Sequence, residues 1–173
     1  MNGKPSKELL KAYEILYHET PLGFYNCGRL CDGLCCRGDE SGMWLFPGEE
    51  ELMKDKEGFE ICETQGNYGY PMVICSGECD RRIRPLACRI FPLFPMVTEE
   101  NGEPEIRIVI DPRAGMCPLS SGKRQFDTGF VKALRRAAQC MVRDPELYEY
   151  LKNVTQELEE IVRLKKMLAG SDF

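Results

Sequence analysis

The pattern of apolar and polar residues predicts helices at both ends of the chain. Residues 6–19, SKELLKAYEILYHE, begin with a serine that favours the helix N-cap and repeat apolar side chains at helical spacing. Residues 127–142 and 144–168 show the same period over longer stretches. The second stretch begins with Asp144 as the N-cap and Pro145 in the first helical position. Because only this short break separates the last two helices, we expect them to form an antiparallel hairpin.

The middle of the chain contains short segments typical of strands. Residues 59–64 and 70–75 are rich in β-branched and aromatic residues and are separated by a turn at Gly66 and Asn67. Residues 105–111, EIRIVID, are a third candidate strand. A short antiparallel sheet accounts for these segments, and together with the helices it predicts an α+β fold.

Two segments before this sheet lack a clear apolar face. Residues 23–47 are rich in glycine and cysteine and have no sustained period, which predicts a loop held by something other than backbone ladders. Residues 48–58, GEEELMKDKEG, predict a helix of two turns that ends at Gly58. Because the apolar face of this helix is thin, we expect it at the surface.

Composition narrows the function classes. A chain of 173 residues with 43% hydrophobic content is the size of one domain, so we expect a single domain over residues 1–173. The net charge is -5 and no stripe of Lys and Arg is present, which argues against nucleic acid as a partner. The first 20 residues lack the apolar centre of a secretion signal, and no apolar run is long enough to span a bilayer. We therefore expect a cytoplasmic protein without membrane contact.

The ten cysteines point to the chemistry. Their density is below that of a disulfide scaffold, and four of them fall within residues 27–36, CGRLCDGLCC. Neighbouring thiolates repel one another unless a cation lies among them, so clustered thiols in a reducing compartment favour metal binding. A metal shared by distant loops would also stabilise the fold. Eight cysteines in three stretches are candidate ligands: Cys27, Cys31, Cys35, Cys36, Cys75, Cys79, Cys88 and Cys117.

The spacing leaves the identity of the metal open. No two cysteines have the C-x-x-C spacing of common zinc sites, although the C-x-x-x-C pairs stay within the range that zinc accepts. Iron-sulfur clusters take four thiolates at less regular spacing. In an extended backbone Cys35 and Cys36 would point to opposite sides, which would place them in two centres or in one polynuclear centre. Outside the clusters, we expect Cys62 and Cys140 in the core, and the only histidine, His18, at a helix end or the surface.

One run of residues resembles a known family. The run is Cys79-x4-Arg84-Pro85-x2-Cys88-Arg89-x-Phe91-Pro92, preceded by a cluster that ends in two adjacent cysteines and followed by Cys117-Pro118. It resembles the YkgJ-type cysteine-cluster family, whose domain is described as zinc- or iron-chelating. The resemblance covers about residues 24–119 and implies metal ligation by the same eight cysteines. Flagellin lysine methylases look similar in this portion, which implies that the module can accompany methyl transfer.

The chain departs from the family in two places. Its first cluster is C-x3-C-x3-C-C where the family has C-x-x-C-x-x-C-C, and Cys75 and Cys79 are closer together than the corresponding pair. The partition of the cysteines between centres is therefore open. Two arginines, Arg84 and Arg89, flank Cys88 and are candidate cofactor-binding residues, because they can donate to sulfur or balance the charge of a thiolate cluster. A surface salt bridge is the alternative.

These observations predict a small, irregular α+β domain stabilised by metal. A cysteine-cluster portion at residues 24–119 would carry the sheet, and a helical hairpin at residues 127–168 would pack on it. We expect the eight cysteines to ligate one or more iron-sulfur clusters, with a role in electron transfer, in sensing or as the protein partner of an enzyme. A structural zinc-binding interaction module is the first alternative, and a component of a methyl-transfer or redox enzyme is the second. No catalytic residue can be nominated, since one histidine gives no pattern of a hydrolytic zinc site.

Overall fold

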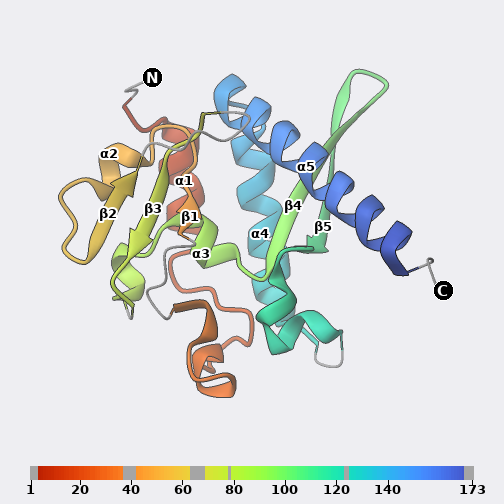
Figure 1. Ribbon diagram of the computed structural model, residues 1–173. Coiled ribbons are helices and arrows are strands. Elements are labelled where there is room, and N and C mark those ends of the chain that lie inside the picture. Colours follow the sequence, from red (N-terminus) through yellow and green to blue (C-terminus); the bar gives the residue numbers. More distant parts are fainter. Residues whose placement is uncertain (1–3, 37–41, 63–68, 78, 123–124, 170–173) are drawn as a thin grey trace.

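The computed structural model describes residues 4–36, 42–62, 69–77, 79–122 and 125–169, and it has an α+β fold (Figure 1). The predicted turn at Gly66 and Asn67 lies outside these residues. The described residues form helices at both ends of the chain and two antiparallel sheets between them in sequence. No helix in the described ranges combines the length and the apolar character needed to cross a membrane.

The first sheet contains two of the predicted strands. It has the order β1-β3-β2, with β1 at Met43–Trp44, β2 at Phe59–Cys62 and β3 at Met72–Cys75. The segment predicted as a two-turn surface helix forms only one turn, α2, at Glu50–Met53. The surface prediction is wrong for Met53, which is 2% exposed and packs with Leu45 and Val73 in a small core of its own.

The second sheet is a hairpin of β4 (Leu93–Glu100) and β5 (Glu103–Ile110). The strand predicted at 105–111 is β5, but it pairs with β4 and not with the first sheet. The two residues of its turn, Asn101 and Gly102, both have positive φ, as a type I′ hairpin requires. Sequence reasoning missed β4, which contains Pro95. The N–H of Val97 points away from β5 to the hydroxyl of Thr155 at 2.8 Å. Positions two apart face the same way, so Pro95 removes no ladder hydrogen bond.

Three long helices form in the segments where the apolar pattern predicts them. They are α1 (Lys7–Ile15), α4 (Thr128–Met141) and α5 (Pro145–Ala169). The predicted N-caps are present: the side chain of Ser6 accepts from Leu9 N at 3.2 Å, and that of Asp144 accepts from Glu146 N at 2.9 Å. The predicted hairpin needs a correction, because α4 and α5 diverge from Asp144 (Figure 1). Helix α4 packs mainly on α1 and β5, whereas α5 packs on β4.

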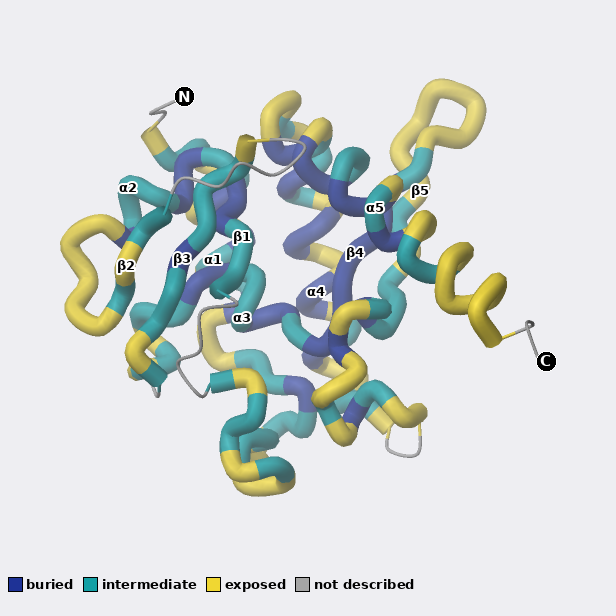
Figure 2. Tube along the Cα trace, in the orientation of Figure 1, coloured by how far each residue is buried: buried dark blue, intermediate teal, exposed yellow. Residues whose placement is uncertain are grey.

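The main core lies between α1, α4, α5 and β4. Most of the segments that carry the cysteines lie in the lower part of Figure 1, with the short helix at Leu86–Ile90 adjoining the core, and Figure 2 shows them mostly half-buried or exposed. They are built from 3-10 helices and one short α-helix: η1 (Cys27–Leu30), η2 (Leu34–Cys36), η3 (Arg81–Ile83), α3 (Leu86–Ile90), η4 (Ala114–Met116) and η5 (Pro118–Ser121). This part of the molecule therefore has little apolar core of its own.

Candidate functional site: the cysteine cluster

Five of the eight candidate cysteines line one small cavity. The cavity has a volume of about 30 Å³, and these five are Cys27, Cys31, Cys35, Cys88 and Cys117. They come from η1, the turn after it, η2, α3 and the link between η4 and η5. Segments that are far apart in sequence thus bring thiols to one place.

The other three candidate cysteines lie beside this cavity or near its edge. The Sγ of Cys36 is 3.8 Å from that of Cys35, and Cys36 and Cys79 both act electrostatically on the Cys88 thiol. Cys75 ends β3, and its thiol donates to the carbonyl of Gly77 at 3.4 Å. A Cβ at position 77 would lie 3.6 Å from the carbonyl oxygen of Cys36, so this turn passes close to the first cluster.

The local sequence explains the turns of the backbone in the first cysteine cluster, residues 27–36. The side chain of Asn26 accepts from Gly28 N at 3.1 Å and starts η1. Asp32 and Gly33 then have φ of 52° and 63°, a left-handed turn that glycine and aspartate tolerate. The N–H of Cys36 donates to Gly33 O at 2.6 Å and closes η2.

This turn corrects one expectation. The backbone at Cys35 and Cys36 is a 3-10 turn, not extended, and their sulfur atoms are 3.8 Å apart. The reason for assigning them to different centres therefore no longer applies.

The cysteine sulfur atoms are the kind of donor that a soft metal prefers, but the distances between them fit a metal site only in part. Within the described residues, no group of three or more His, Cys, Asp or Glu side chains is placed so that it could hold a metal ion. A zinc-sulfur distance of about 2.3 Å gives a tetrahedron with an edge of about 3.8 Å, which the Cys35–Cys36 pair matches. The remaining thiols would have to rotate or shift to reach the same centre.

The surroundings of these cysteines favour the protonated thiol over the thiolate. Burial raises the pKa of Cys27, and the charges of Arg81 and Arg84 oppose that shift. The pKa of Cys88 is also raised, mainly by burial. For Cys35 the pKa is raised first by the hydrogen bond with Cys36 and then by burial. A cation among these sulfurs would reverse this preference, because metal binding releases thiol protons.

The two candidate arginines have different positions. The Nε of Arg84 donates to the Sγ of Cys79 at 3.4 Å, as the charge argument predicts. Arg89 borders the same cavity, but its Nε donates to the carbonyl of Arg84 at 2.8 Å and its Nη2 to that of Arg82 at 3.1 Å. Its guanidinium also lies 4.8 Å from the ring centre of Tyr13. Arg89 therefore holds the backbone that presents Arg84.

Sequence reasoning missed two residues of this region. Arg81 lines the cavity and donates to Glu19 O at 3.1 Å; its place beside Cys79 was the only signal for it. Glu49 is fully buried and accepts from Leu86 N at 2.5 Å, at the start of the helix that carries Cys88. Glu49 is one of three successive glutamates, and nothing in the sequence singles it out.

The residues expected outside the site are outside it. Cys62 is on β2 and Cys140 on α4, and neither lines the cysteine cavity. Both are half-buried, so the prediction that they belong to the core is only partly met. His18 is exposed and packs edge-on against Tyr17 with ring centres 4.7 Å apart, which confirms it as a surface residue.

Comparison with known proteins finds no similarity: no family model, no curated protein and no solved structure matches this chain. The resemblance to the YkgJ-type family stays a prediction from the motif. Function is therefore inferred from the residues of the site.

Proposed function

We propose that the chain binds metal through its eight clustered cysteines and that the bound group is an iron-sulfur cluster. The observation that carries the proposal is the gathering of thiols from residues 27–36, 88 and 117 around one cavity, with residues 75 and 79 nearby. Apart from α3, whose Leu86 and Ile90 belong to the main core, these segments lie outside that core, and their cysteines are mostly half-buried. A shared metal would link them and convert its binding energy into folding energy.

The number and spread of the thiols favour a polynuclear centre. A single zinc ion takes about four ligands, and eight thiols exceed that number. Five of these thiols line one cavity and come from separate segments of the chain. Arg81 and Arg84 supply positive charge on the side of Cys27 and Cys79, which would balance a negatively charged cluster. Electron transfer or sensing fits such a centre, with a protein as the partner.

Zinc is the second candidate. It is favoured by the 3.8 Å separation of the Cys35 and Cys36 sulfurs and by a cavity of about 30 Å³, which has room for a single ion but requires the loops to open for a cluster. In that case the metal would be structural.

Metal analysis of protein purified without oxygen distinguishes an iron-sulfur cluster from a zinc site. Iron and acid-labile sulfide in comparable amounts, with a broad visible absorption band, support the iron-sulfur cluster. A colourless protein with stoichiometric zinc supports the second candidate. Protein that contains neither metal, and that takes up neither on reconstitution, rejects metal binding altogether.

Matched cysteine variants test whether the cluster holds the metal. Cys88→Ser removes a thiol from the wall of the cavity and should lower the metal content per chain strongly. Cys140→Ser makes the same chemical change on α4, outside the cavity, and should retain the parent's metal content. Equal losses in the two variants would assign the metal to something other than this cluster.

A further inference from the structure

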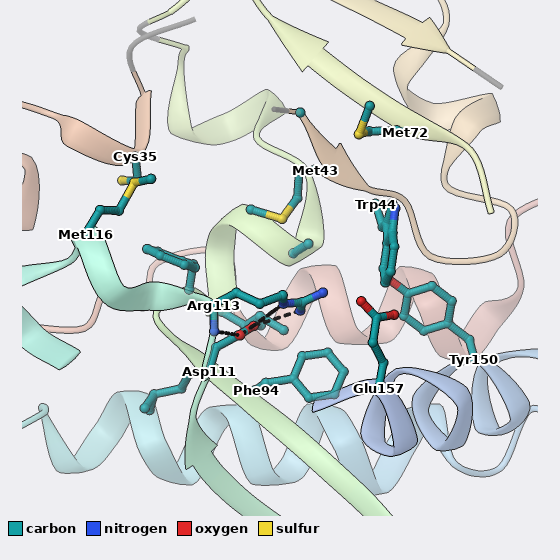
Figure 3. A pocket seen from close by; sticks show the side chains of 15 residues that line it. Cys35, Met43, Trp44, Met72, Phe94, Asp111, Arg113, Met116, Tyr150 and Glu157 are labelled. Carbon is teal, nitrogen blue, oxygen red and sulfur yellow. Dashed lines mark hydrogen bonds and ion pairs between the residues drawn. The ribbon is translucent and has the colours of Figure 1, made fainter. Parts of the chain in front are cut away.

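A second cavity lies beside the cysteine cluster, between β1, α3, β4 and α5. Its volume is about 390 Å³, which is in the range of small-molecule sites. Figure 3 shows Cys35 and Met116 at one end and Trp44 and Tyr150 at the other. The walls are mostly aromatic and thioether side chains, with Phe94 below in this view.

The polar groups of this cavity carry one unbalanced negative charge. Arg113 is already paired with Asp111, Nη2 to Oδ2 at 2.8 Å, and its guanidinium lies 5.4 Å from the Trp44 ring centre. The remaining charge is Glu157, which rises from α5 toward Trp44 and Tyr150 in Figure 3. In the described part of the chain, its carboxylate has no hydrogen bond and no ion pair within 4.0 Å.

The surroundings of Glu157 indicate which class of ligand could pair with its carboxylate. Burial raises the pKa of Glu157, and Arg113 opposes that shift only in part, since its charge is shared with Asp111. An anion would be repelled by the two carboxylates. A neutral apolar molecule would desolvate Glu157 without compensating it. A cation with an apolar body would both pair with Glu157 and pack against the face of Trp44.

We infer that this cavity binds a small organic cation, an amine or quaternary ammonium compound with an apolar body, whose charge lies against Glu157 and whose carbon atoms lie against Trp44 and the methionines. The inference is independent of the metal proposal, because the end of the cavity at Glu157 and Trp44 is formed without the candidate cysteines. Cys35 lines both cavities, so the ligand would lie next to that cluster.

The chain supplies its own probe for this test. Trp44 is the only tryptophan, so its fluorescence reports on this cavity alone. The full chain is titrated with benzyltrimethylammonium, with benzyl alcohol as the neutral comparison and phenylacetate as the anionic one. We expect a saturable change with the cation and binding about tenfold weaker or less with the other two. Equal binding of all three probes, or no saturable change with the cation, would overturn the inference.

Two variants on the same helix test the charge. Glu157→Gln keeps the shape and should weaken binding of benzyltrimethylammonium about tenfold. Glu160→Gln makes the same change at a side chain that is 61% exposed and paired with Arg163, and it should bind as the parent does. Parent-like binding by Glu157→Gln would contradict the inference. Should that variant fail to fold, the order of the three probes on the parent chain decides.

Discussion

Replacing Glu49 with alanine tests whether one buried carboxylate holds together the segments around the cysteine cluster. Glu49 is 0% exposed and accepts hydrogen bonds from Phe46 N at 2.8 Å, from Leu86 N at 2.5 Å and from the hydroxyl of Tyr13. These three donors belong to α1, the loop after β1 and the start of α3. The substitution therefore removes a link between three elements at once.

The magnitude follows from what the variant leaves behind. Two backbone N–H groups and one hydroxyl lose their acceptor in a buried site, and each orphaned donor costs about 1–3 kcal/mol. Removing the buried charge relieves its desolvation and offsets part of this loss, since burial is the largest influence on the pKa of Glu49. We expect a net destabilisation of about 3 kcal/mol, a large part of the 5–15 kcal/mol that is typical of a domain.

The assay is urea unfolding followed by circular dichroism, together with metal content. Glu51→Ala is the matched control, because Glu51 lies on α2 as a near neighbour and its carboxylate pairs with Lys54 at 2.6 Å near the surface. That exposed pair should contribute less than about 1 kcal/mol. Glu49→Ala should also retain less metal, because Leu86 begins the helix that presents Cys88. If Glu49→Ala is no less stable than Glu51→Ala, the proposed link is wrong.

Three further predictions concern stability and metal retention. Burial raises the pKa of Glu49 above its ordinary value of 4.5, so its contribution to stability is complete below that pH and decreases as the pH rises through the folded pKa. We therefore expect the stability advantage of the parent over Glu49→Gln, measured as the difference between their free energies of unfolding, to decrease from about pH 4 to about pH 7. An advantage that increases over this range would contradict a raised pKa of Glu49. Arg84→Met removes the N–H that Cys79 accepts at 3.4 Å and should increase metal loss to a chelator roughly tenfold, whereas the exposed Arg82→Met should not. Thr155→Val leaves a backbone N–H of β4 without its 2.8 Å acceptor and should lower stability by about 1–2 kcal/mol in thermal unfolding; an unchanged melting temperature would show that another group replaces the hydroxyl.

The helices could be predicted because their sequence carries the period of their packing. Leu147, Leu151, Val154 and Leu158 recur at helical spacing, and all are buried against the core. Strand β4 could not be predicted by the same reasoning, because Pro95 argues against a strand unless its neighbours in space are known. The Asn-Gly pair at 101 and 102 was the available signal for the hairpin.

The composition of the candidate site was predictable, but its inner arrangement was not. Cysteine clustering in the sequence selected eight thiols, five of which line one cavity, and charge balance selected Arg84, which donates to a cysteine sulfur. Burial of Glu49 depends on α1, β1 and α3 meeting, which no local pattern encodes. The orientation of Arg89 depends on carbonyls that η3 turns toward it, so a residue adjacent to Cys88 in sequence bonds to backbone and not to sulfur. Of the two arginines that flank Cys88 in sequence, only Arg84 donates a hydrogen bond to sulfur, and that sulfur belongs to Cys79.

The position of the cysteine cluster gives a physical reason for a metal in this fold. Elsewhere the chain is held by apolar packing of helices on β4 and by two hydrogen-bonded sheets. The segments of η1, η2 and η5 have neither, since they form short 3-10 turns and place few side chains in the main core. Short turns of this kind do not offset the conformational entropy of ordering them. Cross-linking them through sulfur and a metal would supply the missing free energy, and it would also fix Cys35 as a wall of the neighbouring cavity.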